Sequence, residues 1–178
     1  GISIMKIERR LDSGPVLWNE EIDILDTDCS GKLHDKLAEI GSKLLIKTVK
    51  DISCGNYQLS VQDEEHTTYA KKIKKEETKI KWDSTADYNQ RFIRAFNPWP
   101  GAWTNIVQER NYRLKILEST VVKDEFNSSY EPGFCSESLI VKCKKNSLKI
   151  LKLQMEGKKE MTRDEFINGY VSKSLFLK

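Results

Sequence analysis

Long apolar runs are absent from this sequence. No stretch of its 178 residues approaches the roughly 20 apolar residues that a membrane-spanning helix needs. The start, residues 1–6 (GISIMK), also lacks the charged, apolar and small-residue regions of a signal peptide. A hydrophobic content of 38% with 32% charged residues is too apolar for wholesale disorder. We therefore expect a globular, cytoplasmic protein that acts as a monomer and does not bind membranes.

Metal-binding side chains are scarce as well. The chain contains four cysteines and two histidines, which are Cys29, Cys54, Cys135, Cys143, His34 and His66. No CxxC or other metal-ligand spacing occurs among the cysteines, and the histidines are isolated from them. We expect reduced thiols without a special role and no metal site.

Most of the chain carries nearly equal numbers of basic and acidic side chains. Residues 1–56 carry 8 basic and 10 acidic side chains, and residues 57–132 carry 12 of each. The net charge of +3 therefore comes from residues 133–178, which carry 10 basic and 5 acidic side chains. A basic end on a balanced body is typical of a polyanion-binding domain, although many solvated surfaces share it.

The first third reads as two strands and a helix. Residues 2–7 and 16–24 are predicted strands, joined by a polar turn over residues 9–15. A helix capped by Asp28 or Ser30 follows, with apolar residues at helical spacing up to Ile52 and Gly55 just beyond its end. Two strands and one amphipathic helix cannot bury both faces of a sheet. Residues 1–56 are therefore interpreted as the edge of a larger α/β domain whose beginning is missing.

The remaining chain predicts a linker and a small β domain. Residues 57–82 are polar and irregular, and a short helix capped by Asp83 or Ser84 ends near Phe96. Five β-rich runs then follow, at residues 103–107, 112–117, 119–123, 138–143 and 148–153. Short strands at this density indicate a small barrel. Thr162, with Glu165 three residues later, predicts a capping box at a last helix.

Four segments in fixed order resemble the methionyl-tRNA formyltransferases. The first is Leu11-Asp12-Ser13-Gly14-Pro15-Val16, and the second is Tyr69-Ala70-Lys71-Lys72-Ile73 with Glu76-Glu77 and Ile80-Lys81-Trp82. The third is the stretch from Ile93 to Trp103 (IRAFNPWPGAW), and the fourth is Gly157-Lys158-Lys159-Glu160-Met161 with Phe166-Ile167-Asn168-Gly169. The Leu-Asp-x-Gly turn is shared by all folate-dependent formyltransferases. Sugar-nucleotide formyltransferases carry something close to the Asn-Pro-Trp-Pro-Gly-Ala-Trp block, whereas the Gly-Lys-Lys block favours the tRNA enzyme.

The resemblance implies a fold and a reaction. Residues 1–56 would be the C-terminal edge of a nucleotide-fold, Rossmann-like formyltransferase domain. Residues 57–82 would be a linker, and residues 83–178 a small OB-like β-barrel. The reaction would be formyl transfer from 10-formyltetrahydrofolate to the amino group of initiator methionyl-tRNA. The catalytic Asn and His of the family would lie upstream of Gly1, so this chain alone is expected to be inactive. The alternatives are a sugar-nucleotide formyltransferase and a stand-alone tRNA- or RNA-binding module.

The resemblance also implies roles for individual residues. Asp12 would orient the catalytic groups and relay a proton, because amine attack on a formyl carbon needs proton movement and oxyanion stabilisation. The alternative is that Asp12 belongs to an ordinary β-turn. The backbone from Ile7 to Leu11, including Arg10, would border the pterin ring of the folate, although Arg9 and Arg10 could also be solvated.

Basic side chains are the candidates for tRNA binding. The candidates are Lys142, Lys144, Lys149, Lys158, Lys159 and Arg94. They do not all share one strand face, and Arg94 could face acidic side chains of its own region instead. Trp99 and Trp103 permit two interpretations: a stacking platform for a base, or a rigid corner whose indoles fill a core.

Overall fold

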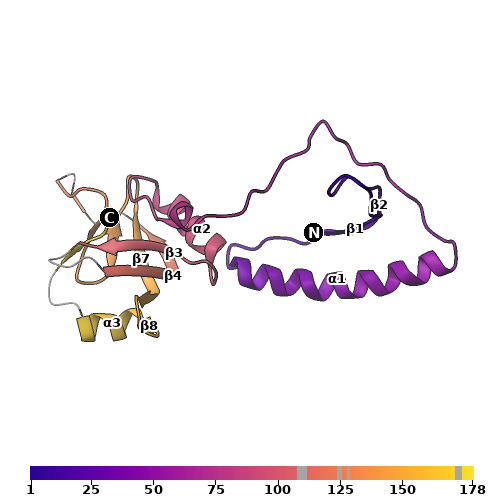
Figure 1. Cartoon of the computed structure of the whole chain (residues 1–178). Helices are drawn as coiled ribbons and strands as arrows, with labels where there is room; N and C mark the ends of the chain where they lie inside the picture. Colours follow the sequence, from indigo (N-terminus) through magenta and orange to yellow (C-terminus); the bar gives the residue numbers. More distant parts are fainter. Residues whose placement is uncertain (108–111, 124–125, 128, 171–173) are drawn as a thin grey trace. The chain divides into compact units, whose positions relative to one another are not determined.

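The computed structural model describes residues 1–107, 112–123, 126–127, 129–170 and 174–178, and it divides into two compact units (Figure 1). The first unit is Gly1–Lys72 and the second is Ile73–Lys178. The division falls inside the segment interpreted as a linker, residues 57–82. The end of that segment belongs to the second unit, because Ile80 and Trp82 are buried in its core.

The first unit contains a hairpin and a long helix. Strand β1 (Ile2–Met5) pairs antiparallel with β2 (Val16–Glu20), and both strands are shorter than the sequence predicted. Helix α1 (Ser30–Ser53) packs against this hairpin (Figure 1). Residues 56–72 follow without helix or strand and contain a turn at residues 64–66, and Ser60 bonds through its main chain to Val16 on β2.

The start of α1 differs from the sequence prediction. Its N-cap is Cys29, whose side chain makes no capping hydrogen bond. Asp28 instead accepts a hydrogen bond from the main-chain N–H of Leu25 and forms an ion pair with Lys36 at 2.7 Å. The hydrogen bond from Lys36, followed by the one from Leu25, lowers the pKa of Asp28. Asp28 therefore ties the loop before the helix to the second turn of α1.

Only one side of α1 is covered within this unit. Leu44 and Thr48 are buried, whereas Ile46 and Val49 are more than half exposed. The main-chain groups at the outer edge of β1 have no strand partner among the described residues. The hairpin therefore covers a fraction of the apolar surface that the helix presents.

The second unit is built on a curled antiparallel sheet. Its strands are β3 (Ala102–Ile106), β4 (Tyr112–Val122), β5 (Phe134–Cys135), β6 (Ile140–Lys142), β7 (Ser147–Met155), β8 (Glu160–Thr162) and β9 (Leu175–Phe176). The order in the sheet is β3-β4-β7-β6-β5-β9, with β8 paired to β7 as well. Because β5, β6 and β7 follow one another as neighbours and β7 lies beside β4, the connection is that of a Greek key.

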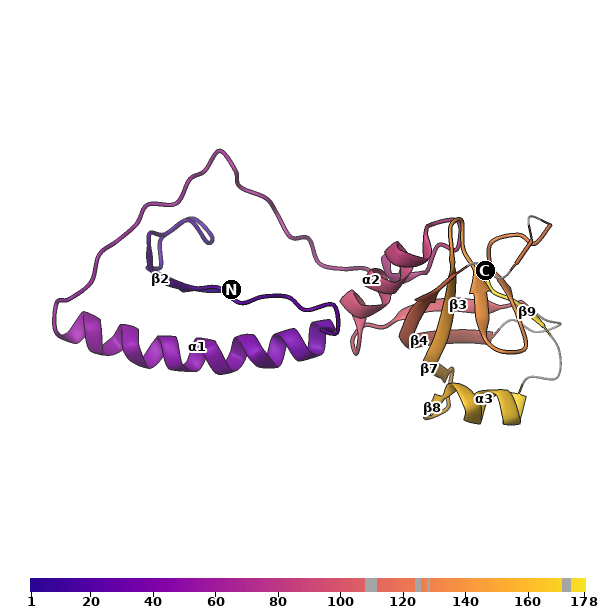
Figure 2. The same cartoon turned by 180° about the vertical axis from the view of Figure 1, so that it is seen from behind.

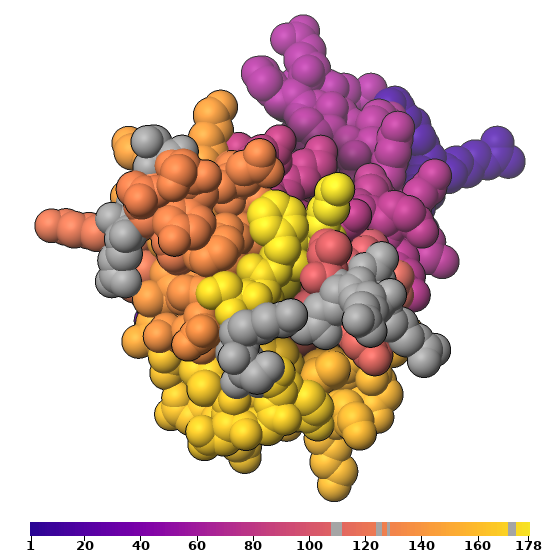
Figure 3. Space-filling model, turned by 90° about the vertical axis from the view of Figure 1, so that its left-hand side faces the viewer, coloured from indigo at the N-terminus to yellow at the C-terminus, as the bar shows by residue number. Residues whose placement is uncertain are grey.

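The C-terminal residues pair with both edge strands of this sheet. Strand β9 pairs with β5, and Leu177 forms a bridge with Ile106 on β3. Asn105 and Lys178 exchange two main-chain hydrogen bonds of 3.0 and 2.9 Å. In Figure 3 the yellow C-terminal residues lie between the red residues of β3 and the orange residues around β5. Edge hydrogen-bonding groups are thus paired on both sides.

Two helices pack on the sheet at separate places (Figure 2). Helix α2 (Ala86–Phe96) contacts β3, β4 and β7, whereas α3 (Arg163–Tyr170) contacts β7 and β8. A short 3₁₀ helix, η1 (Lys75–Thr78), precedes α2. The N-cap of α2 is Thr85 rather than Asp83 or Ser84. The predicted capping box of α3 is confirmed, because Glu165 accepts from the N–H of Thr162 at 2.7 Å.

Buried and more exposed side chains alternate along β3, β4 and β7, and the buried ones form the core. The inward side chains include Ile106, Leu114 and Leu153, each at most 3% exposed. The runs predicted at residues 112–117 and 119–123 form one strand, β4, which carries a register shift between Ile116 and Ser119. The sequence separated them because the shift interrupts the alternation of the strand.

Candidate functional site

The loop between β1 and β2 places Asp12 on the surface. Asp12 adopts a left-handed main-chain conformation with φ of 53°, and its side chain is exposed. Lys6 and Pro15 close the base of the loop by a main-chain hydrogen bond of 2.9 Å. Gly14 is buried there, and a Cβ at this position would lie 1.7 Å from the carbonyl oxygen of Lys6. The turn therefore requires glycine at residue 14.

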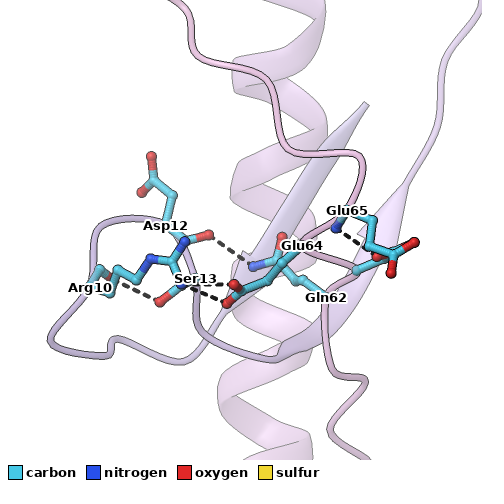
Figure 4. A network of polar contacts seen from close by, with 7 residues as sticks. Arg10, Asp12, Ser13, Gln62, Glu64 and Glu65 are labelled. Carbon is cyan, nitrogen blue, oxygen red and sulfur yellow. Dashed lines mark hydrogen bonds and ion pairs between the residues drawn. The ribbon is translucent and has the colours of Figure 1, made fainter.

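A segment far along the sequence holds this loop in place (Figure 4). The side-chain amide of Gln62 donates hydrogen bonds to the main-chain carbonyls of Asp12 and Gly14, at 3.0 and 2.6 Å. The guanidinium of Arg10 bonds to both carboxylate oxygens of Glu64, each at 2.8 Å. Gln62 thus holds the main chain at Asp12 and Gly14, and the exposed Arg10–Glu64 pair joins the loop to the same segment.

The carboxylate of Asp12 itself is not used by these contacts. In Figure 4 it points away from Gln62 and Glu64, while its carbonyl oxygen faces Gln62. A carboxylate on a fixed main chain with open surroundings can accept a proton from a bound group or orient one. The arrangement at Asp12 thus has the chemical means to handle a proton.

Three residues are expected beside a folate. Two of them have exposed side chains, and the third is held in an ion pair. Ile7 and Leu11 are 89% and 87% exposed, so the loop presents apolar side chains next to Asp12. These side chains suit the flat apolar face of a pterin ring. Arg10 is held by Glu64, which also raises the pKa of the guanidinium. Arg10 therefore shapes the loop, and its charge is already neutralised.

Gln62 and Glu64 were not identified from the sequence. They lie in the polar segment that was interpreted as a linker, and neither alternation nor a turn pattern marks them. The main-chain pairing of Ser60 with Val16 aligns this segment with the hairpin. That pairing depends on tertiary contact, so no local signal predicts it.

The six basic residues expected to bind tRNA do not form one track. Lys142 on β6 and Lys149 on β7 both lie on the outer face of neighbouring strands, where Lys149 pairs in register with Ile140. Lys144 precedes β7, whereas Lys158 and Lys159 follow its other end. With about 3.3 Å per residue, the length of β7 separates these positions by roughly 25–30 Å.

The structure around Arg94 and the two tryptophans bears on the alternatives that the sequence left open. The Nε of Arg94 donates to Gln90 on the preceding turn of α2, at 3.2 Å. Trp99 is 76% exposed, and Trp103 is only partly buried. Of the two interpretations of these tryptophans, the one in which both indoles fill a core is therefore wrong. The core position is taken by Trp82, whose indole N–H donates to Thr104.

Two of the four cysteines lie in the core of the second unit. Cys135 and Cys143 are buried, and burial raises the pKa of the Cys135 thiol to about 12. Among the described residues, no three His, Cys, Asp or Glu side chains are grouped as metal ligands. Within the same residues, no helix is long and apolar enough to cross a membrane.

Comparison with known families identifies a match over most of the second unit. Residues 72–171 match the family model described as formyl transferase, C-terminal domain. A methionyl-tRNA formyltransferase of Methylococcus capsulatus is 35% identical over 173 residues, and one of Bartonella tribocorum is 39% identical over 171 residues. These alignments cover 96% and 95% of this chain but 54% of each relative. The chain thus spans about half the length of the curated relatives it matches.

Solved structures of similar fold include HypX from Aquifex aeolicus. Its complex with tetrahydrofolic acid superposes with a TM-score of 0.68 over 95% of this chain and 30% of that chain. The sequence identity is 12%, so the likeness concerns the fold. Another HypX structure, an A392F-I419F variant, gives a TM-score of 0.65 at 14% identity.

Proposed function

The chain belongs to the formyl transferase family through its C-terminal domain, and on this premise we propose that the protein transfers a formyl group from 10-formyltetrahydrofolate to the amino group of initiator methionyl-tRNA. The observation that carries the proposal is the share of this chain that the alignments with the relatives cover. Relatives named methionyl-tRNA formyltransferase match 95% or more of this chain, which includes the first unit as well as the matched domain. The reaction would take place in the cytoplasm, during translation initiation.

Asp12 is the proposed proton-handling group of this reaction. When an amine attacks a formyl carbon, the nitrogen gains a bond and must lose a proton. The open carboxylate of Asp12, on a main chain held by Gln62, supports this role. The upstream Asn and His that the family resemblance implies would stabilise the oxyanion.

The formyl donor would lie against the same loop. Ile7 and Leu11 would contact the pterin ring, because their apolar side chains are almost completely exposed beside Asp12. Arg10 would act through the shape of the loop, since Glu64 holds its guanidinium. Bound there, the folate supplies the activated formyl carbon, and the loop orients it.

The proposed architecture has two parts. Residues 1–56 would form the C-terminal edge of a Rossmann-like domain, which the uncovered apolar side of α1 supports. The curled sheet of the second unit would act as an OB-like barrel. Lys142 and Lys149 on its outer face would contact the tRNA backbone, with Lys144, Lys158, Lys159 and Arg94 as further candidates.

A product assay with the full-length protein tests the proposal. The protein is supplied with 10-formyltetrahydrofolate and, in parallel reactions, with methionyl-tRNA or with a sugar-nucleotide amine. We expect formylmethionyl-tRNA, detected by mass after hydrolysis of the ester. Formylation of the sugar-nucleotide amine alone would identify a different transferase. Tight tRNA binding without any formyl product would identify a binding module instead.

A further inference from the structure

The guanidinium of Arg10 belongs to the same loop as Asp12 but is held by a carboxylate from another segment. Arg10 and Asp12 are separated by one residue, so their Cα atoms lie at most about 7.6 Å apart. An arginine and an aspartate side chain can meet over that distance. In Figure 4, however, the guanidinium lies against Glu64, and the carboxylate of Asp12 points away from Glu64. Glu64 therefore fixes the position of the positive charge of Arg10.

A free carboxylate lies close to Arg10 on its own loop. Glu8, two positions before Arg10, already forms an ion pair with Lys6 at 3.3 Å. Asp12, two positions after Arg10, has no ion-pair partner among the residues that the structure describes. If Glu64 did not hold the guanidinium, Asp12 would be the unpaired carboxylate within its reach along the loop.

The charge of Arg10 is permanent, so a partner can change only where it lies. The hydrogen bond and the charge of Glu64, followed by the hydrogen bond with Tyr69, raise the pKa of the guanidinium. An arginine does not lose its proton in a protein in any case. Both of these partners come from the segment that follows α1, and they hold the charge on the side of that segment.

The main chain of the loop has supports of its own. Gln62 bonds to the main-chain carbonyl of Asp12, and the main chains of Lys6 and Pro15 close the base of the loop. The side chains of Arg10 and Glu64 are both 63% exposed, and exposed ion pairs stabilise a fold only slightly. Beyond its part in the shape of the loop, the pair therefore matters through the position of a charge.

A guanidinium beside Asp12 would weaken it as a proton acceptor. An opposite charge within about 4–6 Å favours the ionised form of a carboxylate, so the carboxylate takes up a proton less readily. A guanidinium can also occupy both carboxylate oxygens at once, which leaves neither of them open to an incoming amine. A general base must be within hydrogen-bond reach of the proton that it accepts.

We propose that Glu64 is a second positioning residue for formyl transfer, which holds the guanidinium of Arg10 away from Asp12 and so keeps the Asp12 carboxylate open to the attacking amine. The inference rests on the proposed function and adds a residue that acts on Asp12 through Arg10. Gln62 holds the main chain of the loop, whereas Glu64 holds a charge. The alternative is an ion pair that only joins the loop to its neighbouring segment.

Rates of single-turnover formyl transfer in the full-length protein test the role of Glu64. At saturating methionyl-tRNA and 10-formyltetrahydrofolate, we expect Glu64→Gln to react about three- to fivefold more slowly than wild type, which is the range of an exposed ion pair. Its affinity for methionyl-tRNA and its melting temperature should not change. Glu65→Gln removes the same charge from the adjacent exposed position and should react at the wild-type rate.

A second substitution separates a held charge from a structural link. In Glu64→Gln the link is already lost, so a purely structural pair predicts no benefit from removing Arg10 as well. We expect the opposite: the double variant Arg10→Gln and Glu64→Gln should react about two- to threefold faster than Glu64→Gln alone. Arg9→Gln, added to Glu64→Gln, removes a charge from the neighbouring exposed position and should not restore the rate.

The outcomes for Glu64 and for the proposed function are distinct. A wild-type rate in Glu64→Gln, or a double variant with Arg10→Gln that is no faster than Glu64→Gln, would overturn the role of Glu64 and leave the proposed function standing. Equal recovery with Arg9→Gln would overturn it too, because the effect would then not belong to Arg10. Absence of formylmethionyl-tRNA with the wild-type protein would overturn the proposed function itself.

Discussion

The side-chain amide of Gln62 bonds to the main-chain carbonyl of Asp12 at 3.0 Å, across fifty positions of sequence. The same amide bonds to Gly14, so one side chain spans the turn that presents the Asp12 carboxylate. The two partners are main-chain atoms, which means that the contact fixes the position of Asp12 without using its charge. Gln62 is accordingly the proposed positioning residue, and Asp12 is the group proposed to handle the proton.

Replacing Gln62 should slow the reaction more than it weakens substrate binding. Gln62→Leu keeps the size of the side chain and removes both donors, leaving two carbonyls without this partner. Misplacement of a catalytic group is costly even when the shift is small, so we expect kcat to fall about tenfold or more with a small change in KM. Gln58→Leu, on the same exposed segment, is the control and should retain wild-type kcat. Equal losses in both variants would contradict a positioning role.

Gly14 should tolerate no side chain. The Cβ of Gly14→Ala would meet the carbonyl oxygen of Lys6 at 1.7 Å, a distance at which the main chain must move. We expect loss of the loop conformation and of activity in the full-length protein, with the second unit still folded. Gly169→Ala in α3 is the matched control, because nothing lies within 4 Å of its added Cβ. It should be neutral or stabilise the helix by about 0.5–1 kcal/mol. Full activity in Gly14→Ala would contradict the geometry of the turn.

The ion pair of Asp28 with Lys36 should make the stability of α1 depend on pH. The folded-state pKa of Asp28 is lowered from 3.8, so its contribution is complete above that value and is lost as the pH falls below it. We expect wild type to melt at a higher temperature than Asp28→Asn at pH 7, as followed by helical circular dichroism. The difference should shrink below about pH 4. Asp35→Asn, an exposed change on the same helix, should show no such trend.

The 178-residue chain should lack formyltransferase activity by itself. The family resemblance places the oxyanion-stabilising Asn and His upstream of Gly1, and such donors typically contribute about 10²-fold or more to kcat. The purified chain is incubated with methionyl-tRNA and 10-formyltetrahydrofolate at high enzyme concentration. Turnover above the rate measured without protein would show that Asp12 and its loop suffice for formyl transfer.

Local patterns predicted the secondary structure where they were regular. The periodicity of residues 33–52 predicted α1, and Thr162 with Glu165 predicted the start of α3. The two-residue strands β5 and β9 were missed, because pairs such as Leu175–Phe176 carry no alternation. Their pairing is imposed by the closing of the sheet between β3 and β5.

The sequence singled out Asp12 as a candidate, but it did not indicate which residues lie around Asp12. Asp12 could be singled out because the Leu-Asp-x-Gly turn is a recognisable motif. Gln62 could not, since its role comes from tertiary pairing of a polar segment with the hairpin. For Trp103 the sequence left a core position and a stacking platform both open, because no sequence pattern indicates that Arg113 and Lys79 would lie around its ring. The alternation of Arg113 and Lys115 on one strand was the available signal.

The single-turnover rate of formyl transfer by Asp12→Asn in the full-length protein decides whether Asp12 handles the proton. This variant keeps the size of the side chain and removes its ability to accept a proton. We expect the rate to fall by about 10²-fold or more, with unchanged tRNA affinity and melting temperature. Asp23→Asn, an exposed change in the same unit, should react at the wild-type rate. A rate for Asp12→Asn close to wild type would contradict the proton-handling role and reduce the loop to a structural turn.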